Sequence, residues 1–344
     1  MMEPNLTIVI PCYNEGAVLH ETMNQLDALM KRLIEEKLIS NRSKLLFVDD
    51  GSKDDTWMII YKAGLRNERI RGVKLARNVG HQRALLAGLL TARDRSDCVI
   101  SIDADLQDDI EVIREFLLKF TEGYEIVYGV RDNRETDSFF KRNTAQGFYR
   151  LMEKLGVSLV YNHADYRLMS KRALDELSKF EEVNLFLRGI VPLIGFKATS
   201  VYYARKERLA GESKYPLKKM VSFAFDGITS FSITPIRLVL FSGLIAFFIS
   251  LVFGVYFLWL KMYGSTVTGW TSLITSIWLI GGLQLIAIGL IGEYIGKMYI
   301  ETKRRPKYVI DINTYQLPQT AFQSTGSKRF NDENLNMNLT QFQK

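Results

Sequence analysis

Several common sequence signatures are missing from this chain. Among its 344 residues there are only 2 cysteines and 7 prolines, which excludes a disulfide-stapled scaffold and a collagen-like or proline-rich chain. Cys12 and Cys98 lie in apolar runs, so we expect small core residues rather than a disulfide or a metal pair. No Gly-x-Gly and no Gly-Lys-Ser/Thr occurs, which argues against a dinucleotide-binding turn and a P-loop. If the chain binds a nucleotide, it does so without a glycine-rich phosphate cradle.

Excess positive charge is also missing from most of the chain. The formal net charge is +7, but residues 201–344 hold 16 of the 45 basic residues and only 8 of the 38 acidic ones. The first 200 residues are therefore nearly neutral. A hydrophobic content of 47% excludes a disordered chain, and the length suffices for one α/β domain plus a second element.

Two long segments near the C-terminus contain no charge. They cover residues 238–260 and 262–292, and each is longer than the roughly 20 apolar residues that cross a bilayer. We predict a two-helix transmembrane hairpin within residues 235–300, in preference to a buried hairpin in a soluble core. Basic residues flank both segments, whereas the loop between them offers only Lys261. The positive-inside rule then predicts a multi-pass protein of the cell membrane whose N-terminal domain is cytoplasmic.

The segments beside the predicted hairpin have their own compositions. Residues 215–234 mix lysines with apolar side chains, which predicts an amphipathic interfacial helix in the headgroup layer of the lipid bilayer. Residues 301–344 begin with a basic stretch, and after Asp311 the polar composition predicts a mobile tail. The polar start, Met1 to Asn5, gives no signal peptide.

The N-terminal domain, residues 1–214, alternates short apolar runs with helical patterns. This alternation predicts an α/β fold with a mostly parallel sheet covered by helices on both faces. Ligands bind such sheets beyond the carboxyl ends of the strands. The expected strands are Leu6–Pro11, Leu45–Asp49, Gly72–Leu75, Val99–Asp103 and Ile126–Gly129, and the expected helices are Gly16–Lys37, Asp54–Arg66, Gly80–Arg93 and Asp109–Phe120.

Polar clusters follow four of these strands. Each cluster alone has an ordinary explanation as a turn or a helix cap, but packing does not require four carboxylate-rich clusters at one edge. Asp103, Asp105 and Gln107 alternate, so their oxygens would face one side if strand geometry continued past Asp103. Such oxygen ligands suit Mg²⁺ or Mn²⁺, which usually share their shell with phosphate oxygens. The clusters are Pro11–Glu15, Asp49–Asp54, Arg77–Gln82, which contains His81, and Asp103–Asp109.

The ordered combination of motifs resembles one enzyme family. Its motifs are Val9–Glu15, Val48–Ser52, Arg77-Asn78-x-Gly80 and Asp103–Gln107. Together they resemble the family 2 glycosyltransferases of GT-A fold, and more narrowly the polyprenyl-phosphate glycosyltransferases. That group includes dolichol-phosphate mannose synthase and the bactoprenol glucosyltransferases, and its bacterial two-span members fit best. The likeness extends over about residues 5 to 310.

The resemblance implies a role for each matching residue. The donor nucleotide sugar would contact Pro11, Tyr13, Glu15, Asp49, Asp50, Arg77, Asp103 and Lys214, the last in a loop that closes over the nucleotide. The metal ligands would be Asp103, Asp105 and Gln107. Asp165 would be a catalytic or sugar-orienting carboxylate, with Asp105 as the second catalytic residue. Arg131 and Arg142, beside Lys141, would bind the acceptor phosphate.

The activity implied is inverting, metal-dependent transfer of one sugar from a UDP-sugar to undecaprenyl phosphate at the cytoplasmic membrane face. Glucose and N-acetylglucosamine are the leading sugars, a flippase and an external glycosyltransferase would use the product, and the enzyme could form a homo-oligomer. A processive polysaccharide synthase is the alternative, although the chain has no Arg-Trp dipeptide and few spans. A non-catalytic nucleotide-binding membrane scaffold is a third hypothesis, which the intact carboxylates disfavour. Nucleic-acid binding is not expected, because the basic residues flank membrane spans.

Overall fold

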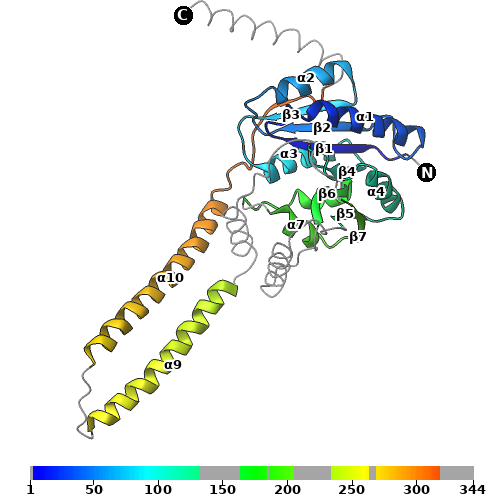
Figure 1. The fold of residues 1–344 in the computed structure, drawn as a ribbon. Coiled ribbons are helices and arrows are strands. Elements are labelled where there is room, and N and C mark those ends of the chain that lie inside the picture. The colour runs from blue at the N-terminus through cyan, green and yellow to red at the C-terminus, as the bar shows by residue number, and fades with distance from the viewer. Residues whose placement is uncertain (1–2, 132–162, 184–185, 205–233, 263–268, 318–344) are drawn as a thin grey trace, which may run out of the picture.

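An α/β domain stands at one end of two long helices (Figure 1). The structure, a computed structural model, describes residues 3–131, 163–183, 186–204, 234–262 and 269–317. One sheet of eight strands runs through the domain in the order β7-β5-β6-β4-β1-β2-β3-β8. Lys141, Arg142, Lys214 and the predicted interfacial helix up to residue 233 lie outside the described residues.

One half of the sheet is parallel, as predicted. It contains β1 (Leu6–Cys12), β2 (Lys44–Asp49), β3 (Ile70–Leu75) and β4 (Cys98–Ser101). β1 lies between β2 and β4, and β3 pairs with β2. These strands are buried almost throughout, which is typical of a sheet covered on both faces. The helices that connect or follow them are α1 (Leu19–Glu35), α2 (Thr56–Arg66), α3 (His81–Arg93) and α4 (Val112–Thr121).

The other half departs from a simple parallel order. β5 (Ile126–Arg131) is separated from β4 by β6 (His163–Ser170), which is antiparallel to both, while β7 (Ala198–Tyr203) is parallel to β5. The helices α6 (Lys171–Leu177) and α7 (Leu187–Leu193) lie between β6 and β7 in the chain. Parallel pairs still outnumber antiparallel ones, so a mostly parallel sheet is confirmed. The insertion of β6 brings Asp165 to the carboxyl edge of β4.

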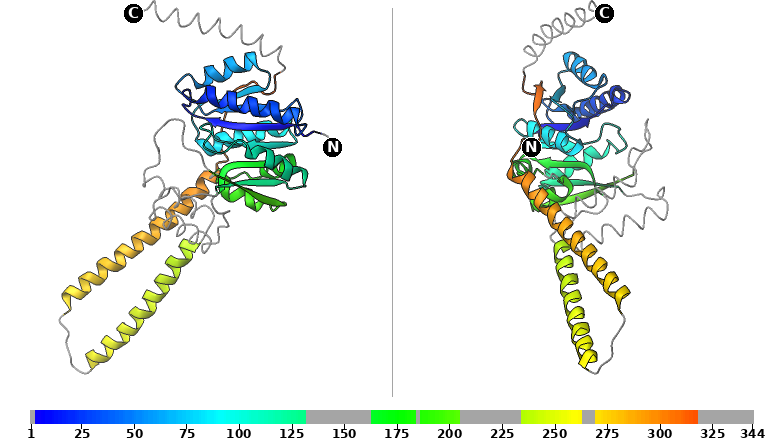
Figure 2. Two further views of the ribbon diagram at one scale, coloured as in Figure 1. Left: turned by 45° about the vertical axis from the view of Figure 1, so that its right-hand side comes forward. Right: turned by 90° about the vertical axis from the view of Figure 1, so that its left-hand side faces the viewer.

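Two apolar layers enclose the sheet (Figure 2). One contains side chains of α1, α2 and α4, and the other contains those of α3, α6 and α7. The helix α3 lies close to the sheet at Gly88, where a Cβ atom would lie 2.4 Å from Val9 Cγ1 and 2.7 Å from Val48 Cγ2. A larger residue would therefore push α3 off the sheet and displace its first residue, His81.

The chain returns to the sheet after the long helices. β8 (Ile310–Asn313) pairs antiparallel with the edge strand β3, and the Thr314 hydroxyl accepts a hydrogen bond from the Gly72 N–H at 2.8 Å. Tyr315 is only 4% exposed, and its hydroxyl lies 2.8 Å from the Thr7 hydroxyl. The predicted mobile tail after Asp311 is therefore wrong up to Tyr315, because strand pairing and burial hold this segment. The domain predicted to end at residue 214 is completed by a segment far beyond it.

The two long helices extend away from the domain as a hairpin (Figures 1 and 2). They are α9 (Thr234–Met262) and α10 (Trp270–Thr302). Within the described part of the chain, one segment, Ile280–Thr302, has the length and apolar character of a membrane span. Large apolar side chains stand exposed on both helices, as expected of surfaces that lipid covers. Among them are Leu240, Phe241 and Val252 of α9 and Ile277, Leu285 and Ile286 of α10. A second crossing by α9 remains a prediction.

Candidate active site

Hydrogen bonds and one contact between His81 and Asp103 join the four predicted clusters at one edge of the sheet. The Asn14 N–H donates to the Ser52 hydroxyl at 3.0 Å, which links the first cluster to the second. The Asp50 carboxylate accepts the N–H groups of Val79 and Gly80 at 2.8 and 2.9 Å, which links the second to the third. In the next link, His81 of the third cluster faces Asp103 of the fourth. The expectation that the clusters lie together is confirmed.

Asp50 builds the loop that precedes His81. Each of its two carboxylate oxygens accepts one backbone N–H, and the side chain is buried. Gly80 adopts a φ of 93°, a left-handed conformation that favours glycine. Gly51 has a φ of 66°, and a Cβ atom there would lie 2.6 Å from the Asn78 backbone nitrogen. Gly51 thus lets the second cluster lie close to the third, and the Asp50 carboxylate binds the third cluster with both of its oxygens.

Asp49, the last residue of β2, has an acceptor that no other described residue engages. It is 0% exposed, and its Oδ1 accepts the Ser52 N–H at 3.2 Å. Its Oδ2 has no hydrogen-bond partner within the described residues. Burial raises the pKa of this carboxyl, against the hydrogen bonds from Ser52. Buried acceptors are seldom left unpaired, so Oδ2 is suited to an N–H group of a ligand. Tyr13, at the end of β1, is 40% exposed, and Arg77 is exposed, whereas Pro11 is buried within the β1–β2 pairing.

Asp165 is surrounded by cations. Arg167 Nη2 lies 2.7 Å from its Oδ1, and Arg188 Nε and Nη2 lie 3.2 Å from Oδ1 and Oδ2 respectively. His81 Nε2 lies 3.5 Å from Oδ2. Burial alone would raise the pKa of Asp165, but Arg188, His81 and Arg167 outweigh it and hold this pKa well below its ordinary value. The carboxylate therefore stays ionised near neutral pH and is a poor proton acceptor.

Asp103 has the opposite surroundings. Its side chain is 41% exposed, and His81 Nε2 lies 3.7 Å from its Oδ1. Desolvation raises the pKa of this carboxyl, and the negative charges of Asp108, Asp165 and Asp105 outweigh the opposing effect of His81. For His81, burial would lower the imidazole pKa, but Asp165 and Asp103 raise it above its ordinary value. The Asp103 carboxylate thus lies where a further positive charge would be stabilising.

The loop after β4 does not keep the expected strand geometry. β4 ends at Ser101, the chain turns at Ala104, and Leu106 has a positive φ of 48°. Strand geometry does not continue past Asp103, so the condition under which Asp103, Asp105 and Gln107 would face one side is not met. Gln107 is buried, and its N–H donates to Asp105 Oδ1 at 3.3 Å. Within the described ranges, no three His, Cys, Asp or Glu side chains are placed to hold a metal ion.

Arg131 is held by a buried partner. Its Nε and Nη2 donate to Asp108 Oδ1 at 3.1 and 3.0 Å, and the Tyr203 hydroxyl donates to the same oxygen at 2.6 Å. Burial would lower the pKa of the guanidinium, but Asp108 and Tyr203 raise it. Arg131 lies 28% exposed at the end of β5, so a phosphate could reach it only beside Asp108.

Comparison with known proteins places the chain in a family. The model of the family described as Glycosyl transferase family 2 matches residues 7–178. The chain belongs to glycosyltransferase family 2. It is 64% identical over 313 residues to the uncharacterized glycosyltransferase YkoT of Bacillus subtilis (strain 168), covering 91% of this chain and 93% of that protein. It is 38% identical over 310 residues to the bactoprenol glucosyl transferase of Shigella phage SfV, covering 89% and 97%.

A solved structure gives a more distant likeness to this glycosyltransferase. The mannosyltransferase PcManGT from Pyrobaculum calidifontis, in complex with GDP-Man and Mn²⁺, matches with a TM-score of 0.44 and 14% identity. The match covers 85% of this chain and 87% of that one. The family membership itself identifies a glycosyltransferase with a GT-A-like α/β fold, as the sequence motifs predicted.

The glycosyltransferase has site residues that the motifs did not include. Arg188 lies in α7, among apolar residues, and Asp108 was noticed only as part of an acidic run. A lone arginine in an apolar helix is a usable signal, because its guanidinium must find a partner. Nothing local in the sequence identifies that partner as Asp165, since β6 and α7 meet only in the fold.

Proposed function

We propose that this glycosyltransferase transfers a single sugar from a UDP-sugar to undecaprenyl phosphate at the cytoplasmic face of the cell membrane, with inversion at the anomeric carbon. The observation that carries the proposal is the pair of contrasting carboxylates, Asp103 and Asp165, on either side of His81. Relatives named bactoprenol glucosyl transferase, which match 89% of this chain, support a polyprenyl acceptor. They make glucose the first sugar to test and N-acetylglucosamine the second.

The nucleoside of the donor would bind near the ends of β1 and β2. The unpaired Oδ2 of Asp49 would accept an N–H group of the base, which removes a buried unsatisfied acceptor. The exposed ring of Tyr13 would lie against the nucleoside, and Pro11 and Glu15 flank it in the chain. Arg77 and, in the closing loop, Lys214 remain proposed contacts of the diphosphate.

A divalent cation fits the crowded carboxylates of the β4–α4 loop. Asp103 and Asp105 would hold Mg²⁺ or Mn²⁺ together with donor phosphate oxygens, because such ions are commonly bound by one or two carboxylates plus phosphates. The raised pKa of Asp103, caused by burial and by neighbouring carboxylates, supports this assignment. A bound cation supplies positive charge that stabilises the departing diphosphate. Gln107 remains a proposed further ligand.

The acceptor needs orientation more than deprotonation. A lipid monophosphate is largely ionised near neutral pH, so no general base is required. Asp165, held ionised by Arg188, His81 and Arg167, suits an orienting carboxylate. Arg131 and Arg142 remain the proposed phosphate contacts, since a guanidinium binds phosphate through two N–H groups.

The membrane would present the acceptor to this site. We place both α9 and α10 across the bilayer with the domain in the cytoplasm, because apolar side chains are exposed along both helices and basic residues flank them. The product would then pass to a flippase and an external glycosyltransferase.

The test is a screen of nucleotide sugars with the full chain in detergent. Purified enzyme, Mn²⁺ and undecaprenyl phosphate are incubated with UDP-glucose, UDP-N-acetylglucosamine or another common nucleotide sugar, and the lipid is weighed by mass spectrometry. We expect one added hexose from UDP-glucose and none with a matched Asp105→Ala preparation. A polymeric product would support a processive synthase instead, and no transfer from any donor would refute the proposal.

A further inference from the structure

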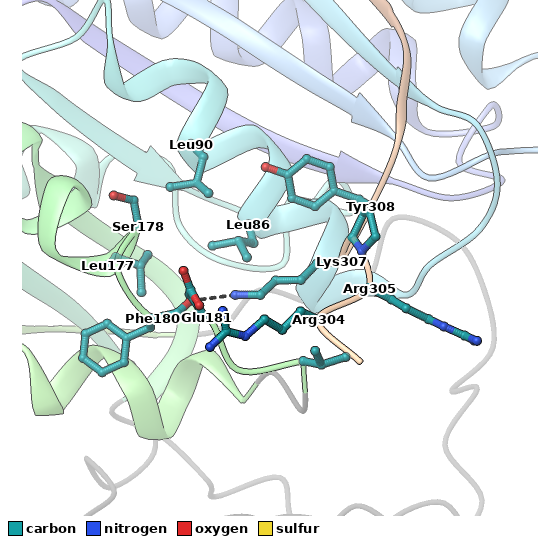
Figure 3. Close-up of a pocket in the computed structure, with 12 residues that line it drawn as sticks. Leu86, Leu90, Leu177, Ser178, Phe180, Glu181, Arg304, Arg305, Lys307 and Tyr308 are labelled. Carbon is teal, nitrogen blue, oxygen red and sulfur yellow. Dashed lines mark hydrogen bonds between the residues drawn. The ribbon is translucent and has the colours of Figure 1, made fainter. Parts of the chain in front are cut away.

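Polar contacts join the end of α10 to the connection between α6 and α7, of which the structure describes residues 178–183 and Phe186. The Glu301 carboxylate, in the last turn of α10, accepts a hydrogen bond from the Val183 N–H at 2.7 Å. Just beyond the helix, Lys307 Nζ donates to the Phe180 carbonyl at 2.6 Å (Figure 3). Both hydrogen bonds involve a charged group, so each is stronger than a neutral one. The end of α10 therefore holds this connection at two points.

The same connection is bound on its other side to the first turn of α3. Arg83 Nη2 donates to the Val183 carbonyl at 3.3 Å. The Leu187 N–H donates to Gln82 Oε1 at 3.0 Å. Val183 thus contacts α10 through its N–H and α3 through its carbonyl. Gln82 and Arg83 directly follow His81 in the chain. A displacement of the connection would therefore also displace His81.

These hydrogen bonds connect α10 to two side chains that contact Asp165, namely His81 of α3 and Arg188 of α7. His81 Nε2 lies 3.5 Å from one carboxylate oxygen of Asp165. Arg188, the residue after Leu187, contacts both oxygens at 3.2 Å. Two of the three basic side chains around Asp165, Arg188 and His81, are therefore carried by elements that the connection joins to α10.

Hydrogen bonds matter here because packing does not fill the space beside the connection. A cavity of about 430 Å³ lies between the connection, α3 and the segment after α10 (Figure 3). Leucines of α3 and α6 line one side of it, and Phe180, Glu181 and Val183 line another. Side chains that border a cavity lose contacts on that side. The polar contacts of Glu301 and Lys307 restrain this face of the connection together with the packing of Val183 and Phe180.

The helix α10 is long enough to reach the domain from a membrane. With 33 residues it is about 50 Å long, whereas the hydrocarbon core of a bilayer is about 30 Å thick. The whole helix therefore exceeds one crossing, and its charged end, residues 293–302, can extend toward the domain. That extension brings Glu301 to Val183.

We propose that Glu301 is a positioning residue for sugar transfer, which holds the α6–α7 connection so that Arg188 and His81 stay against Asp165. The inference rests on the proposed function, because it assigns Asp165 to the reacting site. It makes the helix that enters the membrane part of the support of that site. Arg188 and His81 are the groups through which Glu301 acts.

The kinetic test compares three variants of the full chain. Glu301→Ala removes the acceptor, and we expect kcat to fall about tenfold with less than a twofold change in the donor KM, since small displacements of catalytic groups are costly. Glu301→Gln keeps an oxygen that accepts the Val183 N–H, and we expect it to retain at least a third of the wild-type kcat. Glu293→Ala, on the same helix, is the matched control and should leave kcat within about twofold. A Glu301→Ala kcat equal to that of Glu293→Ala would overturn the proposal.

A variant cycle tests whether Glu301 acts through Arg188 and His81. In a background that carries both Arg188→Ala and His81→Ala, Glu301→Ala should lower kcat by less than about twofold, because both groups that it positions are already gone. A further tenfold loss in that background would show independent action and refute the proposed route.

Hydrogen exchange separates this inference from the proposed function. Amide exchange in residues 178–190 should speed up at least fivefold in Glu301→Ala and stay unchanged in Glu293→Ala, whether or not an acceptor has been identified. Unchanged exchange in Glu301→Ala would show that Glu301 does not hold the connection, and it would not affect the proposed transfer reaction. If Glu301→Ala speeds up exchange but the wild-type enzyme transfers no sugar, the role of Glu301 in holding the connection is supported and only the proposed function is refuted.

Discussion

The two carboxylates that face His81 lie in contrasting regions of one site. Asp165, from β6, is bound by Arg167 and Arg188, and its pKa is held well below the ordinary value because these cations and His81 outweigh its burial. Asp103, from the end of β4, is desolvated beside other carboxylates, and its pKa is raised. The protein thus supplies positive charge to one carboxylate, and we propose that the other takes a charge that arrives with the substrate.

This difference separates two kinds of task. A carboxylate already paired with arginine can orient a ligand without changing its own charge, whereas a carboxylate held near others gains by binding a cation. The division predicts that changes on the β4 side act through the metal and the donor. Changes on the β6 side should act through the geometry and stability of the site.

Asp105→Ala tests the β4 side and should have the largest effect. Removing a proposed metal ligand should lower transfer by about a thousandfold or more, because the charge on the departing diphosphate loses its stabilisation. The rate of labelled lipid formation measures it. Asp311→Ala, an exposed aspartate on β8, is the control and should transfer normally. Wild-type rates in Asp105→Ala would remove the metal assignment.

Asp165→Asn tests the β6 side. We expect about a hundredfold loss of transfer and a loss of roughly 3–5 kcal/mol in the free energy of unfolding, because Arg167, only 1% exposed, would be left without a counter-charge. Chemical denaturation and the transfer assay measure the two effects. The pKa of Asp165 is lowered on folding, so this stabilisation is present above about pH 4 and is lost as the pH falls through the folded-state value.

A second paired carboxylate controls for stability alone. Asp27 accepts a hydrogen bond from Arg69 at 2.8 Å, which with Asn67 and Lys31 outweighs its burial and lowers its pKa to about 2. It lies in α1, outside the predicted clusters. Asp27→Asn should destabilise the fold without lowering kcat of the folded enzyme. If Asp165→Asn behaved in the same way, Asp165 would have no part in the reaction.

Asp49→Asn extends the comparison to the donor side. Its amide nitrogen can no longer accept an N–H group of the base at the Oδ2 position, so we expect the KM for the UDP-sugar to rise about tenfold with a smaller change in kcat. Calorimetric titration with UDP measures the same loss without turnover. Asp55→Asn, an exposed residue before α2, should bind UDP normally. Unchanged UDP affinity in Asp49→Asn would show that the nucleoside does not bind at Asp49.

The smallest expected shift is in the thermal stability of Asp103→Asn in metal-free buffer, and it is opposite in direction to that of Asp165→Asn. The pKa of Asp103 is raised on folding, so its ionised form lowers stability above that pKa, and stability recovers as the pH falls through it. Replacing the carboxylate in metal-free buffer at neutral pH should therefore raise the melting temperature slightly, since the side chain is partly exposed. A marked fall in the melting temperature would contradict the contrast between the two carboxylates.

Local patterns in the sequence predicted the parallel half of this site. The strands β1 to β4 and their helices follow from apolar runs and helical periodicity, and the polar residues after each strand had to meet at the carboxyl edge. Asp49, Asp50, His81 and Asp103 were accordingly expected together. The turn after Asp103 was not expected. Leu106 adopts a left-handed backbone conformation there, and a leucine in the sequence does not indicate such a conformation as a glycine would.

Pairings between distant segments were out of reach of local patterns. β6 enters between β4 and β5, and β8 joins β3 only after the chain has passed through α9 and α10. Neither pairing follows from composition, because strand order depends on which edges remain available in the folded domain. Tyr315 is an example. Its neighbours in the sequence are polar, yet in the fold its side chain is buried and its hydroxyl lies against that of Thr7.

The dependence of transfer on a divalent cation is the most direct test of the central claim, that Asp103 lacks a charge which the substrate complex must bring. Labelled glucose from UDP-glucose is followed onto undecaprenyl phosphate by the full chain in excess chelator and then in increasing Mn²⁺ or Mg²⁺. We expect no lipid product in chelator, full recovery with metal in the wild type, and no recovery in Asp103→Asn. Equal product formation in chelator and in metal would contradict it.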